Sequence, residues 1–297
     1  MAYKVKKVKN TPLSILAESP VWHPEEKVLY WVDIVGGKLF SYDPRKEETR
    51  TVKLGSMVGA VVPASGEYSV IVALETGVFG LTLNEELKKL SNYPENEIKD
   101  NRFNDGKCDP AGRFWIGTMN KNVIEKAGNL YVFNGNNLEL KQPEVTISNG
   151  IAWSIDHKTM YYIDTAEYAV FAYDFDYLSG VISNRRIAIK IPEDAGAPDG
   201  MTIDSNGMLW VAHWGGFAVR CWDPGTGKIV DEIDIPAPHV TSCTFGGENL
   251  NTLYITTASE GLSEAQIQQY PLSGAIFKVE LNVKGVSNYL FKNTLDL

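Results

Sequence analysis

One pattern recurs along the whole chain and restricts the folds that it can adopt. Each copy has an aromatic or β-branched stretch, a short turn and a second stretch in which polar and apolar residues alternate. The copies begin at Leu29, Tyr68, Phe114, Met160, Leu209 and Leu253. They are separated by 39, 46, 46, 49 and 44 residues, which is the range of four-stranded propeller blades. The repeat therefore predicts an all-β chain folded as a six-bladed β-propeller.

A β-sandwich or two smaller sheets would also contain short alternating strands, but neither needs a regular repeat over the full length. No linker, low-complexity tract or charge block marks a boundary, so we expect one domain spanning residues 1–297. Alternation in residues 3–8 (YKVKKV) predicts a further strand that joins the last blade. Such a strand would close the ring and remove an exposed sheet edge.

Charge and composition exclude several classes of partner. The net charge of −9, without a local Lys/Arg cluster, disfavours nucleic acid and anionic membranes. The first ten residues lack the apolar core of a signal peptide, and no stretch approaches the ~20 apolar residues of a membrane span. We therefore expect a cytoplasmic protein, and the sequence leaves its oligomeric state open. The three cysteines, Cys108, Cys221 and Cys243, lie far apart, which predicts buried or inert thiols.

Four oxygen-bearing side chains stand ten or eleven positions ahead of copies of the repeat: Glu18, Asn104, Asn149 and Asp199. If the blades are equivalent, the loops that enter their inner strands open at one end of the central channel. These side chains would then converge at one mouth. Two carboxylates and two amide oxygens suit Ca²⁺, Mg²⁺ or Mn²⁺. Taken singly, the Asn-Gly and Asp-Gly pairs could be turn formers and nothing more.

Short motifs in chain order resemble the SMP-30/gluconolactonase/luciferin-regenerating enzyme-like (regucalcin) family. They cover nearly the whole chain and lie at residues 18–22 (ESPVW), 102–107 (RFNDGK), 109–113 (DPAGR), 117–119 (GTM), 148–153 (SNGIAW), 198–201 (PDGM) and 240–243 (VTSC). The resemblance implies a six-bladed propeller that binds one divalent cation and hydrolyses sugar lactones to aldonic acids.

The resemblance also implies roles for individual residues. The implied cation ligands are Glu18, Asn149 and Asp199, with Ca²⁺ as the favoured ion and Zn²⁺, Mn²⁺ or Mg²⁺ as alternatives. Arg102 and Asn104 would contact the substrate, although Arg102 alone could equally form a surface ion pair. Asn122 would bind substrate at a position where many relatives carry an acidic residue. Asp199 is in addition the implied base, while the metal would polarise the lactone carbonyl and activate water.

Two other functions stay open at this point: an organophosphate (fluorophosphate) hydrolase, and a calcium-binding regulatory protein without physiological turnover. The presence of Arg102 and Asn104 favours an enzyme, because cation storage needs no substrate contacts. Outside this set, Asp33 and Asp164 occupy equivalent places in their repeats, and we expect them to hydrogen-bond neighbouring loops. His213 and Trp214 either line the channel or serve packing.

Overall fold

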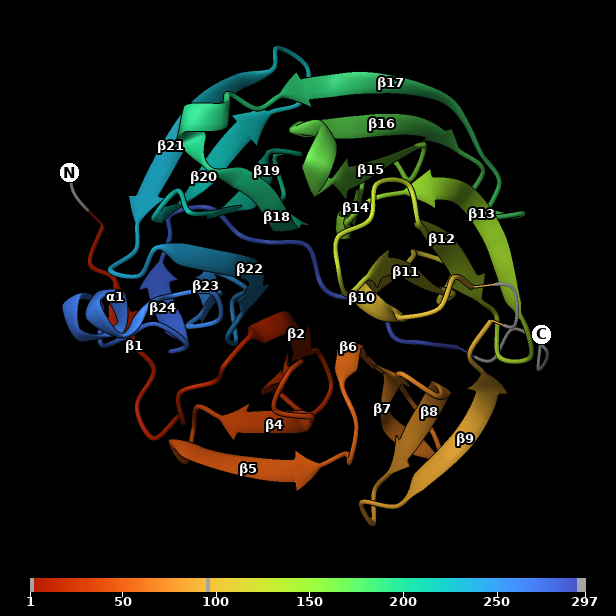
Figure 1. Ribbon diagram of the computed structural model, residues 1–297, viewed down its shortest axis with the longest axis horizontal. Helices are drawn as coiled ribbons and strands as arrows, with labels where there is room; N and C mark the ends of the chain where they lie inside the picture. Colours follow the sequence, from red (N-terminus) through yellow and green to blue (C-terminus); the bar gives the residue numbers. More distant parts are fainter. Residues whose placement is uncertain (1–2, 95–96, 293–297) are drawn as a thin grey trace.

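The protein is built almost entirely from antiparallel strands. The computed structural model describes residues 3–94 and 97–292. Four separate four-stranded sheets and one eight-stranded sheet stand around a common axis (Figure 1). The chain is therefore all-β and propeller-like, and the sandwich alternative is wrong.

The four separate sheets are meanders whose strands follow sequence order. The first contains β2 (Ala17–His23), β3 (Val28–Asp33), β4 (Lys38–Asp43) and β5 (Glu48–Lys53). The second contains β6 (Val58–Pro63), β7 (Tyr68–Leu74), β8 (Gly77–Thr82) and β9 (Leu87–Asn92). The third contains β10 (Asn101–Cys108), β11 (Phe114–Asn120), β12 (Gly128–Phe133) and β13 (Leu138–Val145). The fourth contains β14 (Ser148–Trp153), β15 (Thr159–Asp164), β16 (Ala169–Phe175) and β17 (Ile182–Lys190).

The eight-stranded sheet consists of two runs of strands. One run is β18 (Ala197–Ile203), β19 (Leu209–Trp214), β20 (Ala218–Asp223) and β21 (Lys228–Asp234). The other is β22 (His239–Gly246), β23 (Thr252–Ala258), β24 (Phe277–Glu280) and β1 (Lys6–Lys7). A single residue pair, Trp214 with His239, joins the runs. Because β1 pairs antiparallel with β24, the predicted N-terminal closing strand is confirmed, although it is short.

The innermost strands form a closed ring. Neighbours in contact are β2 with β6, β6 with β10, β10 with β14, β14 with β18, β18 with β22, and β22 with β2. Figure 1 shows these strands around the axis, with the remaining strands of each sheet stepping outwards. Helix in the described ranges is limited to α1 (Glu264–Gln269) and two 3₁₀ turns, η1 (Thr165–Glu167) and η2 (Glu193–Ala195). None of these helices is long and apolar enough to cross a membrane.

The aromatic repeat of the sequence forms the second strand of each sheet, where both faces are covered. On β3, Trp31 and Val32 point to opposite faces of the sheet and are both fully buried. Between the third and fourth sheets, the rings of Trp115 and Trp153 meet edge to face with centroids 6.2 Å apart. Strands buried on both faces carry continuous apolar runs, which explains why these segments stand out in the sequence. The cysteines are buried and unbridged, as predicted.

Asp33 and Asp164 have equivalent structural roles. Asp33 accepts hydrogen bonds from two backbone N–H groups just ahead of β2, each at 3.1 Å. Asp164 does the same for two N–H groups just ahead of β14, at 2.9 and 3.0 Å. The predicted contacts to neighbouring loops are confirmed. They fix where two of the inner strands begin.

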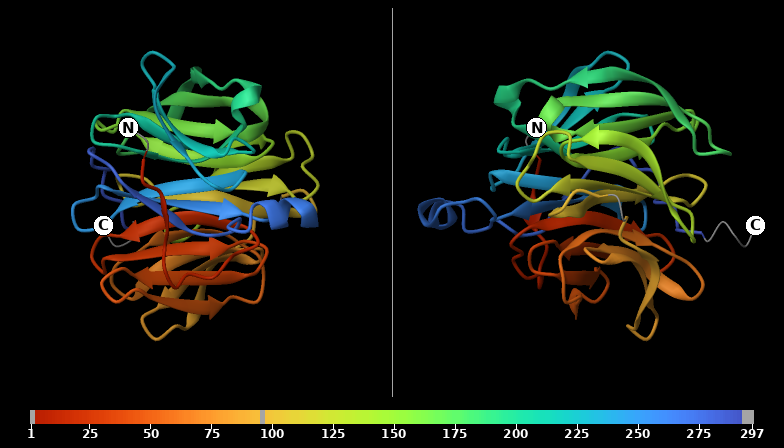
Figure 2. Two further views of the ribbon diagram at one scale, coloured as in Figure 1. Left: turned by 90° about the vertical axis from the view of Figure 1, so that its left-hand side faces the viewer. Right: turned by 45° about the vertical axis from the view of Figure 1, so that its right-hand side comes forward.

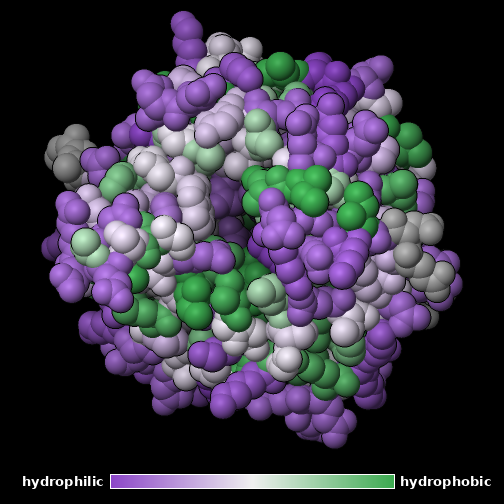
Figure 3. All heavy atoms as spheres, viewed as in Figure 1, coloured by the Kyte–Doolittle hydropathy of each residue, from purple (hydrophilic) through white to green (hydrophobic). Residues whose placement is uncertain are grey.

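The segment after β24 crosses one end of the central channel (Figures 1 and 2). The N–H of Gly285 donates to the carbonyl of Leu250, and the N–H of Phe291 to the carbonyl of Pro63, both at 2.7 Å. Between them, Asn288 Nδ2 donates to the carbonyl of Trp22 at 3.1 Å. This segment closes the channel on one side, while the face in Figure 3 is hollowed at its centre.

Candidate active site

The four oxygen-bearing side chains lie on inner strands. Glu18 is on β2, Asn104 on β10, Asn149 on β14 and Asp199 on β18. At or just beyond each of them, the pairing with the second strand of the sheet shifts register, which marks a β-bulge. The prediction that they sit in entry loops is therefore wrong. A bulge turns a side chain away from its regular direction, and here four bulges recur at matching points around one channel.

Crowding at the axis explains the small residues that looked like turn formers. A Cβ on Gly150 would lie 2.8 Å from the carbonyl oxygen of Asp199 on the next inner strand. On Gly200 it would lie 2.0 Å from Ser242 Oγ on the strand beyond. Neither glycine has a positive φ, so turn geometry does not require them. They are glycines because neighbouring inner strands approach too closely for a side chain.

A single cavity of about 480 Å³ collects all of the predicted site residues except Asn122 at the open mouth of the channel. Its polar lining consists of Glu18, Arg102, Asn104, Lys121, Asn149, Thr165, Tyr168, Asp199 and Glu260. Figure 3 shows the hollow at the centre of this face. Residues nearly two hundred positions apart thus share one site, which is the convergence that their spacing predicts.

Hydrogen bonds hold these side chains in fixed orientations. Asn104 Nδ2 donates to Asn149 Oδ1 at 3.0 Å, and Asn149 Nδ2 donates to Thr165 Oγ1 at 2.8 Å. Arg102 Nη1 donates to Asn104 Oδ1 at 2.6 Å. Among the described residues no ion pair of Arg102 is found, and its side chain lines the cavity. Asn149 Oδ1 keeps a second lone pair, because an amide oxygen can accept twice.

Negative charge is buried at the mouth without full compensation. Glu18 and Asp199 are 5% and 7% exposed. Burial and the charge of Asp105 raise the pKa of Glu18. Burial, Glu18 and Asp105 raise the pKa of Asp199 in the same way, and Arg102 opposes both shifts only in part. A bound cation would relieve this repulsion, since an opposite charge favours the ionised carboxylates.

The donor set fits a hard divalent cation. In residues 3–94 and 97–292, no group of three or more His, Cys, Asp or Glu side chains is placed to hold a metal. Any further protein ligand of a cation bound by Glu18 and Asp199 would then be an amide, hydroxyl or backbone carbonyl oxygen. Asn149 supplies one in the same cavity, and carboxylate and amide oxygens are ligands that Ca²⁺ accepts.

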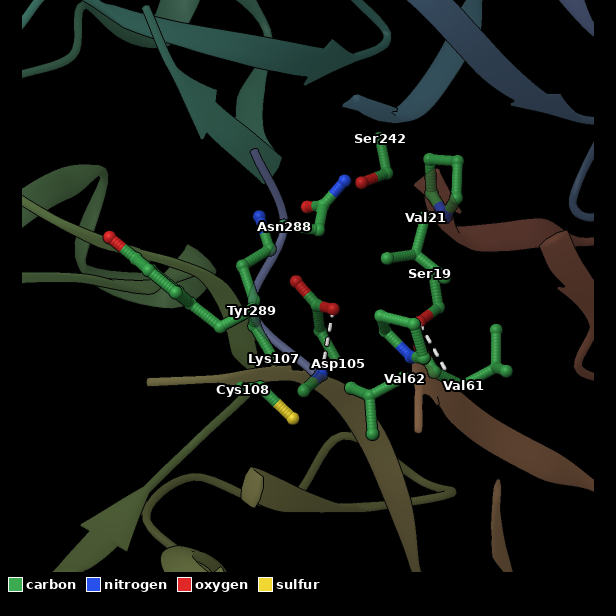
Figure 4. A pocket seen from close by; sticks show the side chains of 13 residues that line it. Ser19, Val21, Val61, Val62, Asp105, Lys107, Cys108, Ser242, Asn288 and Tyr289 are labelled. Carbon is green, nitrogen blue, oxygen red and sulfur yellow. Dashed lines mark hydrogen bonds between the residues drawn. The ribbon is translucent and has the colours of Figure 1, made fainter. Parts of the chain in front are cut away.

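Sequence reasoning missed a second pair of charged residues below the site. Asp105 and Lys107 line a separate small cavity of about 10 Å³, together with Asn288 from the segment that closes the channel (Figure 4). Lys107 Nζ donates to the carbonyl of Met201 at 2.6 Å. Burial raises the pKa of Asp105 and lowers that of Lys107. The signal was available, because both residues follow Asn104 in the RFNDGK motif.

Asn122, His213 and Trp214 lie in three different surroundings, and His213 follows the packing alternative. Asn122 is exposed on the turn after β11, and its backbone N–H donates to Asn120 Oδ1 at 3.0 Å. Its neighbours on both sides line the cavity, whereas Asn122 is not part of the lining, so its contact with substrate stays a prediction. His213 is fully buried against Trp222, and burial lowers its pKa to about 4. Trp214, in contrast, lines the cavity.

Comparison with known proteins gives a consistent result. A sequence model of the SMP-30/Gluconolactonase/LRE-like region matches residues 16–259. YvrE of Bacillus subtilis, provisionally named a sugar lactone lactonase, is 38% identical over 274 residues, which cover 92% of this chain and 93% of YvrE. Regucalcin of Gallus gallus is 39% identical over 284 residues, covering 93% and 94%. The structure of regucalcin from Agrobacterium tumefaciens, described as a calcium-binding protein, aligns with a TM-score of 0.93 at 25% identity over 98% of each chain.

Proposed function

The chain belongs to the SMP-30/gluconolactonase/LRE-like family, and from this premise we propose that it is a divalent-metal-dependent hydrolase that opens sugar lactones to aldonic acids. One observation carries the proposal: two buried carboxylates, two amides and the guanidinium of Arg102 line a single cavity. The provisional name of YvrE supports a lactone as substrate.

The proposed ligands of one cation are Glu18, Asn149 and Asp199. An all-oxygen set favours Ca²⁺, and the description of the Agrobacterium protein as calcium-binding supports that choice. Zn²⁺, Mn²⁺ and Mg²⁺ are the alternatives. When bound, such an ion polarises a carbonyl oxygen and lowers the pKa of a coordinated water.

The side chains of this protein supply positioning and a proton acceptor. Arg102 uses one nitrogen to bond Asn104, which leaves other N–H groups to orient the ring and carbonyl oxygens of the lactone. Asp199, whose pKa is raised by burial, accepts a proton from the attacking water. The water oxygen bonds to the carbonyl carbon and the ring C–O bond breaks. The ring oxygen takes up a proton, so the product is an open-chain hydroxy acid.

We further infer that the eight-stranded sheet represents two propeller blades, which gives six blades in one domain of residues 1–297. Two features support this count: a single residue pair joins the two runs of the sheet, and their first strands, β18 and β22, take consecutive places in the inner ring. Equivalent positions of six inner strands would then face one axis.

Chelation and two substitutions test the activity. Hydrolysis of glucono-δ-lactone should disappear after treatment with EDTA and return with added divalent cation. Asp199→Asn should abolish turnover, whereas Arg102→Ala should mainly raise KM. Full activity in a metal-free preparation, or parental kinetics for both variants, would contradict the proposal.

A calcium-binding regulator without turnover is the second candidate, and the regucalcin relatives support it. It predicts tight Ca²⁺ binding with no hydrolysis across a panel of lactones. The third candidate, an organophosphate hydrolase, separates from the first when rates on glucono-δ-lactone and on a fluorophosphonate are compared. Arg102 and Asn104 favour an enzyme over a storage site, because neither is needed to hold a cation.

A further inference from the structure

We propose that the cavity accepts lactones whose ring carries an alkyl or aryl substituent, and turns them over more efficiently than polyhydroxylated sugar lactones. The inference rests on the proposed lactonase activity, and it changes the preferred substrate of that activity from sugar lactones to alkyl- or aryl-substituted lactones. It comes from the walls of the cavity above the predicted ligands, which are largely apolar. In Figure 3, hydrophobic side chains flank the central hollow on more than one side.

The layer directly above the ligands is an apolar collar, formed by Leu16, Ile147 and Ala197. Each stands two residues before one of the three predicted cation ligands, and alternate residues of an extended chain face the same side. All three line the cavity. Arg102 holds the equivalent place before Asn104 and is the charged interruption in this layer. A substituent that leaves the lactone ring towards solvent can therefore pack against aliphatic side chains in this layer.

An aromatic ring extends the apolar wall. Trp214 stacks on His239 with ring centroids 3.9 Å apart and an interplanar angle of 14°. His239 is itself held by a hydrogen bond between its Nδ1 and the carbonyl of Glu260, at 2.9 Å. The indole is therefore fixed before any ligand binds. A fixed indole offers a flat apolar surface on which an aryl ring or an alkyl chain can lie.

Several polar groups of the cavity are already paired with other groups of the protein. Both polar atoms of the Asn104 amide form hydrogen bonds within the protein. Thr165 Oγ1 accepts from Asn149 and donates to the carbonyl of Pro198. Lys121 forms an ion pair with Glu75. The several hydroxyls of a sugar lactone would depend on Arg102, Tyr168 and Glu260 for partners, whereas an alkyl substituent needs none. A hydroxyl buried without a partner weakens binding.

Val123 brings a further apolar side chain to the rim, and its neighbour Ile124 offers a matched control. Val123 is 51% exposed and lines the cavity. Its backbone is left-handed, with φ of 53°, a conformation that β-branched residues rarely adopt. Ile124 is also 51% exposed but does not line the cavity. A polar substitution at Ile124 therefore changes surface polarity without changing the wall.

A homologous series of δ-lactones tests the proposal. Glucono-δ-lactone, δ-hexalactone, δ-octalactone and δ-decalactone share a six-membered ring and differ in what it carries. We expect kcat/KM to rise about fourfold per added methylene until the wall is covered, and to exceed the value for glucono-δ-lactone at least tenfold for δ-decalactone. A flat series, or a preference for glucono-δ-lactone, would overturn the inference.

Two variants locate the effect. Ile147→Thr keeps the β-branched shape but places a hydroxyl in the collar, so it should lower kcat/KM several-fold more for δ-decalactone than for glucono-δ-lactone. Ile124→Thr should leave both values unchanged. If both variants behave alike, the collar does not select the substrate.

Binding of unreactive ring ethers separates this inference from the proposed activity. If no lactone is hydrolysed, the proposed lactonase activity is refuted. Calorimetric titration with 2-pentyltetrahydropyran and 1,5-anhydroglucitol then shows whether the cavity prefers an alkyl or a polyhydroxylated ring. Tighter binding of the alkyl ether supports the apolar cavity without the enzyme. Tighter binding of the polyol, or equal binding, refutes it.

Discussion

Replacing Glu18 by Gln should have opposite effects on the metal-free and the metal-bound protein. Glu18 and Asp199 are buried together, and each carboxylate has a raised pKa, because burial and nearby negative charge penalise its ionised form. Glu18→Gln removes one of the two repelling charges at nearly constant shape. It also removes one of two carboxylate ligands. Without metal the substitution should therefore stabilise the fold, and with metal it should weaken binding.

The sign of the pH dependence follows from the direction of the shifts. Both folded-state pKa values lie above those of the unfolded chain, so the metal-free fold is most favoured at low pH and loses stability as pH rises through the folded values. Each pKa unit corresponds to about 1.4 kcal/mol. For a chain of this length, a change of that size in the free energy of unfolding shifts Tm by roughly 2 °C. In EDTA at pH 8, Glu18→Gln should melt at least about 2 °C above the parent, and the difference should vanish towards the ordinary Glu value of 4.5.

With Ca²⁺ present the order should reverse. Removing one partner of a buried charge pair costs about 3–5 kcal/mol, so affinity should fall roughly 150- to 5000-fold in calorimetric titration. Glu260→Gln is the matched control, because Glu260 is an exposed carboxylate in the same cavity and should change neither measurement. Lower melting of Glu18→Gln in EDTA at pH 8, or unchanged Ca²⁺ affinity, would refute the reasoning.

Three further predictions concern the fold. Gly200→Ala would place a Cβ 2.0 Å from Ser242 Oγ and 2.9 Å from its Cα, so it should cost about 1–3 kcal/mol in urea unfolding; a neutral result would mean that the inner strands can separate. Asp109→Ala leaves the guanidinium of Arg113 and the indole N–H of Trp115 without their buried acceptor. It should cost about 3–5 kcal/mol, and a loss below 1 kcal/mol would contradict the structural role. The three buried thiols, whose pKa values are raised by burial, should resist Ellman's reagent at pH 8 until the protein is denatured; rapid labelling of the folded protein would argue against this.

The fold was largely accessible to sequence reasoning. The copies of the repeat became the hairpins β3–β4, β7–β8, β11–β12, β15–β16, β19–β20 and β23–β24. The alternation near the N-terminus became β1 on the last strand. These features are local, because strand periodicity and turn chemistry are set by residues that are neighbours in the chain. The segment after β24 that closes the channel has no such pattern and went unpredicted.

The candidate site could be predicted from the sequence only in part. The matched offsets correctly placed Glu18, Asn104, Asn149 and Asp199 in one cavity. Their neighbouring glycines suggested loops, but the residues lie at bulges in inner strands, where glycine is needed for close approach. Asn122 has the expected position in the chain but lies outside the cavity lining.

The sequence by itself determined which segments pair into hairpins and which oxygen-bearing side chains occupy equivalent positions, since both follow from spacing along the chain. Tertiary structure decided what those side chains meet. Three features depend on the distance of each sheet from the common axis. They are the partial pairing of Arg102, the burial that raises the pKa of Asp199, and the apolar collar with Leu16 and Ile147. That distance results from packing between sheets, because the contacting residues come from strands far apart in the sequence.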